Sequence, residues 1–192
     1  MPMNLPNMLT LGRIVMIPVF AVVFFMPVEW ANLAAAAVFG LAALTDWLDG
    51  FLARRLGMTS AFGAFLDPVA DKLIVAMALV ALLAENPSPW FALAVAVIIG
   101  REITVSALRE WMAELGKRAR VAVNAIGKFK TAAQMVAILM LVYADPILGL
   151  PTYHIGFVLL FVAAALTLWS MVVYLQAAMV VLREEDRRTR KA

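Results

Sequence analysis

The chain has 192 residues, of which 65% are hydrophobic and 15% are charged, with a formal net charge of +3. Soluble domains are much less apolar, so the composition predicts one integral membrane domain over residues 1–192 and gives no reason to expect a nucleic-acid partner. The chain has no cysteine and a single histidine, which excludes disulfides, thiolate metal sites and multi-histidine metal centres.

Six apolar segments are long enough to cross a bilayer, or nearly so, since a spanning helix takes about 20 residues. Short polar or proline-bearing breaks separate them. We therefore expect an all-α fold with six transmembrane helices. The segments are residues 9–25, 33–54, 67–84, 90–108, 129–143 and 155–182.

The basic residues predict how the chain is oriented. The first, third and fifth breaks contain no Lys or Arg, and all 16 basic residues lie toward the other ends of the apolar segments. Because basic residues are retained in the cytoplasm, both termini and the second and fourth breaks are predicted to be cytoplasmic. Residues 1–10 carry no basic residue, so we expect no cleaved signal peptide.

Four aspartates, Asp46, Asp49, Asp67 and Asp71, lie within 26 residues at the cytoplasmic ends of the second and third segments. Spacings of three and four place each pair on one face of a helix. Carboxylates near a bilayer are costly, so such a cluster indicates a functional site. Ligand sets made only of oxygen suit magnesium, manganese or calcium. Solvated helix caps are the simpler interpretation, but caps do not require this spacing.

Asp67 is followed by Pro68, a pair that is typical of a helix start. That start would make the second and third segments an antiparallel pair with the carboxylates at their facing ends. Two metal ions in such a site would clamp a phosphoryl group from both sides. The outermost carboxylate would be free to accept a proton from an attacking hydroxyl.

The aspartates belong to a longer pattern, D-x2-D-G-x2-A-R-x8-G-x3-D-x3-D, which resembles the signature of the CDP-alcohol phosphotransferases. Segments 4–13, 100–111 and 119–134 are also similar to the bacterial phosphatidylglycerophosphate synthases of that family. The resemblance implies a six-helix protein of the bacterial cytoplasmic (inner) membrane, a site open to the cytosol and a homodimer. The eight matching positions are Asp46, Asp49, Gly50, Ala53, Arg54, Gly63, Asp67 and Asp71.

The resemblance also implies roles for individual residues. The four aspartates would bind two ions of Mg²⁺ or Mn²⁺, with Asp46 and Asp67 bridging both, and Asp71 would also act as the catalytic base. The attack would displace CMP from CDP-diacylglycerol. Residues that would contact this lipid nucleotide are Asn7, Thr10, Gly50, Ala53, Arg54, Ser60 and Gly63.

The acceptor alcohol requires a phosphate site of its own if it is glycerol 3-phosphate. Arg101 and Arg109 are eight residues apart, about two helical turns, and so share a face. Together with Lys128 and Lys130 they are candidates to bind that phosphate. Anchoring by the positive-inside rule is the alternative for these residues. Arg13 is equally open, either as an interfacial anchor or as a residue that faces the same cavity.

Several functions remain open at this stage. Within the family, the acceptor could instead be serine, inositol phosphate or phosphatidylglycerol. A divalent-cation transporter is a reading from a different class, but the apolar segments show no ionisable residue in their middle or outer halves to form a path. A purely structural scaffold would leave the aspartate pattern without a purpose. Glycerol 3-phosphate is the favoured acceptor because of the concentration of Arg and Lys near the fourth and fifth segments.

Overall fold

The structure is a computed structural model, and it describes residues 5–56, 61–114 and 125–189. These residues form helices and no strands, which confirms the all-α prediction. The helices are α1 (Leu5–Phe24), α2 (Ala31–Leu56), α3 (Ala61–Glu85), α4 (Pro89–Glu114), α5 (Ala125–Tyr143) and α6 (Thr152–Thr189).

The start of α3 differs from the sequence prediction. The helix begins at Ala61, so Pro68 lies inside it and the expected helix start at Asp67 is wrong. Proline removes one backbone hydrogen bond, but membrane helices tolerate it where neighbouring groups satisfy the freed carbonyl. The residues before Asp67 are mostly Ala and Phe, which extend the apolar helix in the N-terminal direction.

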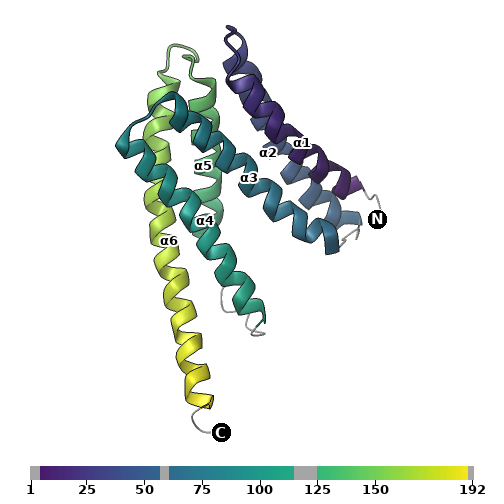
Figure 1. The fold of residues 1–192 in the computed structure, drawn as a ribbon, viewed down its shortest axis with the longest axis vertical. Coiled ribbons are helices and arrows are strands. Elements are labelled where there is room, and N and C mark those ends of the chain that lie inside the picture. The colour runs from purple at the N-terminus through teal and green to yellow at the C-terminus, as the bar shows by residue number, and fades with distance from the viewer. Residues whose placement is uncertain (1–4, 57–60, 115–124, 190–192) are drawn as a thin grey trace.

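The helices form two groups (Figure 1). In the first, α1 packs along both α2 and α3, and in the second, α6 packs along α5 and α4. The connections α1–α2, α3–α4 and α5–α6 lie at one end of the molecule, whereas both termini lie away from that end (Figure 1). Which end faces the cytoplasm stays a prediction from the basic residues.

A hydrophobic core joins the two groups. Its members come from all six helices, and rings from separate helices meet in it: Phe20 with Phe39, and Phe91 with Phe157. A second, smaller cluster of Val105, Met112, Tyr174 and Ala178 joins α4 to α6 nearer their C-terminal ends. Among the side chains that the structure describes, none from the first group belongs to this second cluster.

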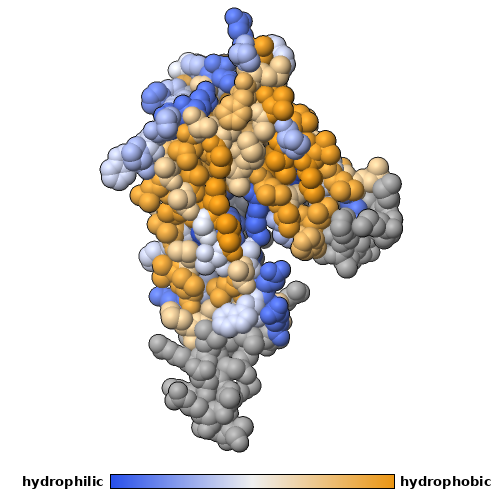
Figure 2. Space-filling model, viewed as in Figure 1, coloured by the Kyte–Doolittle hydropathy of each residue, from blue (hydrophilic) through white to orange (hydrophobic). Residues whose placement is uncertain are grey.

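The outer faces of the helices are apolar. Within the described part of the chain, three helices contain segments long and apolar enough to cross a membrane: residues 7–24 of α1, α4, and residues 152–179 of α6. Shorter apolar stretches occupy residues 31–46 and 130–143. Large side chains such as Val22, Leu93 and Trp169 are exposed on these faces, and Figure 2 shows hydrophobic residues covering both groups. Such an exposed apolar surface indicates a membrane protein.

Candidate active site

A buried arginine of α1 holds together two of the predicted aspartates. The side chain of Arg13 is fully buried, and its Nη1 atom lies 3.2 Å from Oδ1 of Asp46 on α2. The same nitrogen donates to Oδ1 of Asp71 on α3. Carboxylates from two different helices therefore converge on one point, with the guanidinium between them.

The same face of α1 contacts a third aspartate. The Thr10 hydroxyl donates a hydrogen bond to Oδ1 of Asp67, and Asn7 is buried one turn earlier. Asn7, Thr10 and Arg13 follow one another at steps of three, which places them on one helix face. The N-terminal half of α1 thus lies against the acidic ends of α2 and α3.

The donor chemistry of this cluster fits a hard divalent cation. Its oxygens come from aspartate side chains, and carboxylate oxygens are ligands that magnesium and manganese prefer. Asp46 and Asp71 already share one positively charged partner in the structure. Among the side chains described, no three His, Cys, Asp or Glu residues lie close enough together to hold a metal ion. The side chain of Asp49, the fourth aspartate, is not among those described.

A second polar cluster lies on the other group of helices. Arg101 of α4 donates from Nη1 to Oε1 of Glu102 at 2.9 Å and from Nη2 to Oγ of Ser170 on α6 at 3.2 Å. Nζ of Lys130 on α5 lies 2.7 Å from the same Glu102 oxygen. The Lys130 side chain is only 1% exposed. Its ion pair with Glu102 offsets part of the cost of burying this charge. One oxygen of Glu102 therefore ties α4 to α5.

A cavity of about 930 Å³ separates the two clusters. Arg13, Asp46 and Asp71 line one wall, and Arg101 and Arg109 belong to the other. Figure 2 shows hydrophilic side chains in the hollow between the two groups of helices. The volume suits a small-molecule or cofactor-sized ligand.

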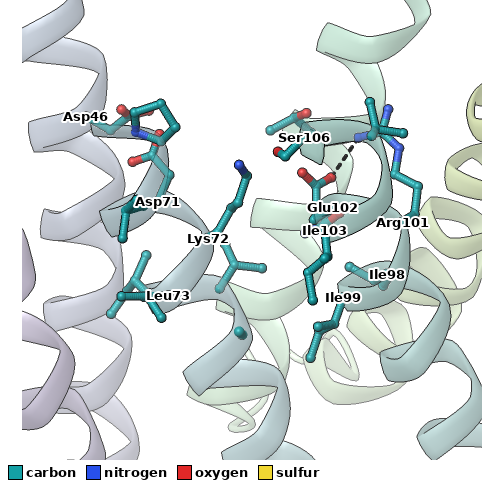
Figure 3. Close-up of a pocket in the computed structure, with 18 of the residues that line it drawn as sticks. Asp46, Asp71, Lys72, Leu73, Ile98, Ile99, Arg101, Glu102, Ile103 and Ser106 are labelled. Carbon is teal, nitrogen blue, oxygen red and sulfur yellow. Dashed lines mark hydrogen bonds and ion pairs between the residues drawn. The ribbon is translucent and has the colours of Figure 1, made fainter. Parts of the chain in front are cut away.

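Lys72 extends into this space. Figure 3 shows its amine between Asp71 on one side and Glu102 and Ser106 on the other. The cavity thus offers carboxylates, a lysine ammonium and the three guanidinium groups of Arg13, Arg101 and Arg109 to a ligand that enters it. That combination suits the binding of a polyanionic ligand together with a metal cation.

The structure brings together many of the predicted site residues. Asp46, Asp71, Arg101 and Arg109 line the cavity, and Lys130 is connected to it through Glu102. Gly63 is buried in α3. Five predicted residues lie in helices where their side chains are not described, and a sixth, Ser60, lies outside the described residues altogether. The five are Asp49, Gly50, Ala53 and Arg54 in α2, and Lys128 in α5.

Arg13, Lys72 and Glu102 are charged residues of the cavity that were not assigned to it from the sequence. Arg13 had a signal, because a charged residue close to the start of an apolar segment indicates function or anchoring, but spacing alone did not decide between the two. Glu102 adjoins Arg101, and a carboxylate beside predicted phosphate-binding cations is a signal for an ion pair. Lys72 follows Asp71 directly, and the sequence includes it only among the basic residues that predict the orientation of the chain.

Known proteins resemble the chain over nearly all of its length. Residues 3–182 match the family described as CDP-alcohol phosphatidyltransferase. Enzymes named CDP-diacylglycerol–glycerol-3-phosphate 3-phosphatidyltransferase from Escherichia coli (strain K12) and Shigella flexneri serotype 5b (strain 8401) are each 55% identical to it over 178 residues. These matches cover 93% of this chain and 96% of each relative. The resemblance predicted from the aspartate pattern is confirmed, and the chain belongs to the CDP-alcohol phosphatidyltransferase family.

Proposed function

We propose that this protein transfers the phosphatidyl group of CDP-diacylglycerol to glycerol 3-phosphate, releasing CMP and forming phosphatidylglycerophosphate. Relatives named for this reaction are 55% identical over 93% of the chain. The structural observation that carries the proposal is a cavity shared by both groups of helices, with carboxylates on one wall and arginines on the other. A reaction between two phosphorylated substrates requires both kinds of group within reach of one space.

The carboxylate wall is the metal site in this proposal. Divalent ions are general in the family, and here Asp46, Asp49, Asp67 and Asp71 would hold two ions of Mg²⁺ or Mn²⁺. When bound, such ions neutralise charge on the phosphates and on the departing CMP. Asn7, Thr10, Gly50, Ala53, Arg54, Ser60 and Gly63 are assigned to the lipid nucleotide. The contact between Thr10 and Asp67 supports placing this nucleotide beside the metal site.

The opposite wall positions the acceptor. Arg101, Arg109, Lys128 and Lys130 are assigned to the phosphate of glycerol 3-phosphate, which leaves its far hydroxyl directed across the cavity toward Asp71. Asp71 takes the proton from this hydroxyl as its oxygen bonds to the β-phosphorus. The bond from that phosphorus to the oxygen of CMP breaks, and CMP leaves with the electron pair. Holding both partners in line supplies much of the rate enhancement.

The same proposal includes the setting of the enzyme. The chain forms one domain over residues 1–192 with six membrane-spanning helices, both termini in the cytoplasm and the cavity open to the cytosol. It resides as a homodimer in the bacterial cytoplasmic membrane, where its lipid substrate is present, and it binds no nucleic acid. Bacterial relatives and the common end shared by the α1–α2, α3–α4 and α5–α6 connections support this arrangement.

The proposal is tested by CMP release from CDP-diacylglycerol, using purified protein in detergent with Mg²⁺. Glycerol 3-phosphate, serine, inositol phosphate and phosphatidylglycerol are offered separately. We expect release with glycerol 3-phosphate only, its loss on metal chelation, and a decrease of about 10³-fold or more in Asp71→Asn, since the base is removed. Asp145→Asn makes the same chemical change in the α5–α6 connection and should leave the rate unchanged. Release with a different acceptor would overturn the acceptor assignment, and metal-dependent ion uptake without lipid turnover would favour a transporter.

A further inference from the structure

A tyrosine behind the cavity wall contacts both arginines. Tyr174 of α6 is 7% exposed, and its ring centroid lies 5.1 Å from Cζ of Arg109 and 5.6 Å from Cζ of Arg101. Its hydroxyl accepts a hydrogen bond from Nη2 of Arg109 at 2.9 Å. One turn earlier on α6, Ser170 accepts from Arg101. Residues of α6 support the arginines without lining the cavity themselves.

This arrangement solves a physical problem of the acceptor site. Two like charges on one helix face repel each other, and each arginine side chain has many rotamers. An aromatic ring shared by both guanidiniums attracts each of them through its negative face. Among the described residues, Tyr174 is the one hydrogen-bond partner of the Arg109 side chain, which is otherwise exposed. Without the tyrosine, Arg109 would be free to leave the cavity.

We propose that Tyr174 is a positioning residue that holds Arg101 and Arg109 as a preorganised pair for the phosphate of the acceptor. The inference rests on the proposed function and adds a residue of α6 to it. Tyr174 does not touch the substrate; it acts by reducing the entropy that the arginines lose on binding. Its effect should therefore fall on acceptor affinity and leave affinity for CDP-diacylglycerol unchanged.

Tyr174 also belongs to the buried cluster with Val105, Met112 and Ala178. Its contribution to packing and its contacts with the arginines therefore need to be tested with separate variants. Tyr174→Phe keeps the ring and removes only the hydroxyl, whereas Tyr174→Leu removes the ring but retains apolar bulk. Tyr153→Phe is the matched control, because it removes a hydroxyl bonded to Asn86 near the other end of the same helix. Each purified protein is assayed for kcat and for both KM values, and its binding of glycerol 3-phosphate alone is measured by calorimetry.

We expect Tyr174→Phe to raise the KM and Kd for glycerol 3-phosphate about fivefold, and Tyr174→Leu to raise them by about tenfold or more. The KM for CDP-diacylglycerol should stay within about twofold, because that substrate is assigned to the opposite wall. The control should behave as the unmodified protein. Unchanged acceptor affinity in both Tyr174 variants would overturn the inference, as would a fall in kcat and in affinity for both substrates alike with a lowered melting temperature.

Calorimetry separates this inference from the proposed function. Unmodified protein that binds glycerol 3-phosphate without turning it over would refute the reaction, and loss of that binding in the Tyr174 variants would still support the positioning role. If the unmodified protein neither binds glycerol 3-phosphate nor releases CMP in its presence, both proposals are wrong.

Discussion

Arg13 places a positive charge inside the aspartate cluster. Its guanidinium is fully buried, whereas the side chains of Asp46 and Asp71 remain 46% and 41% exposed. The arginine therefore offsets the mutual repulsion of the two carboxylates in the protein without metal. A divalent ion bound by the same oxygens would take over part of that task. Arg13 and the ion are then expected to compete for the two carboxylates.

This competition predicts how an Arg13→Ala variant responds to metal. Without metal, the variant should be less stable by about 1–3 kcal/mol, because both carboxylates lose their buried partner. Added Mg²⁺ should reduce the difference in stability between the variant and the unmodified protein. An ion that binds only the folded protein stabilises it, and in the variant it no longer competes with the arginine for the carboxylates. The measurement is the melting temperature in detergent with EDTA and with Mg²⁺. Arg13→Lys, which keeps the charge, should lie between the two proteins. An equal loss of stability in both conditions would refute the competition.

Spacing in the sequence was sufficient to select Asp46, Asp71, Arg101 and Arg109, because their types and intervals suit phosphate and metal chemistry. It was not sufficient for Arg13 or Glu102. Whether Arg13 faces lipid or the aspartates depends on how α1 packs on its neighbours. The partner of Glu102 on α5 is 28 residues away along the chain, and no periodicity records that contact.

The apolar segments predicted the existence and order of the helices but not all of their ends. The length of an apolar segment is a strong signal that a helix exists. An aspartate marks the start of that helix only if the residues before it are not helical. Before Asp67 they do not, so α3 starts six residues earlier than the aspartate suggested. Helix α4 similarly continues to Glu114, beyond the predicted end at residue 108, because Trp111 and Met112 maintain an apolar side.

Helices α5 and α6 approach each other closely at Gly156. A Cβ atom added there would lie 2.9 Å from Cβ of Met140 and 3.1 Å from the carbonyl oxygen of Ala137. Small residues allow such close approach between membrane helices. A hydropathy pattern does not predict helix pairing of this kind, because it takes no account of the small size of glycine.

Gly156→Ala is therefore expected to destabilise the protein by about 1 kcal/mol or more, since overpacking outweighs the better helix propensity of alanine. Gly40→Ala is the matched control, because its added Cβ would meet Leu139 at an ordinary 3.8 Å. Thermal unfolding in detergent should show a lower melting temperature for the first variant only. Acceptor KM should be unaffected in both, because neither glycine lines the cavity. Equal melting temperatures for the two variants would contradict this prediction, because helices α5 and α6 would then have moved apart at little cost in stability.

At the scale of the molecule, the site exists because two groups of helices share a core and diverge beyond it. The aspartates lie on the first group, and Arg101, Arg109 and Lys130 lie on the second. The distance between them follows from tertiary packing, so the sequence predicted both halves of the site but not the cavity between them. The basic residues did predict on which side of the membrane that cavity opens, and this is a property of the whole chain that can be measured directly.

The absence of cysteine makes that measurement clean, because a single introduced thiol is the only one in the chain. Leu148, 98% exposed in the α5–α6 connection, and Glu114, exposed at the end of α4, lie on opposite predicted sides. In bacteria with a permeabilised outer membrane, a membrane-impermeant maleimide should label Leu148→Cys at once. Glu114→Cys should react only after the cytoplasmic membrane is opened, and the unmodified chain should not react. The reverse pattern would place the cavity outside the cell, away from the cytosolic glycerol 3-phosphate that the proposed reaction requires.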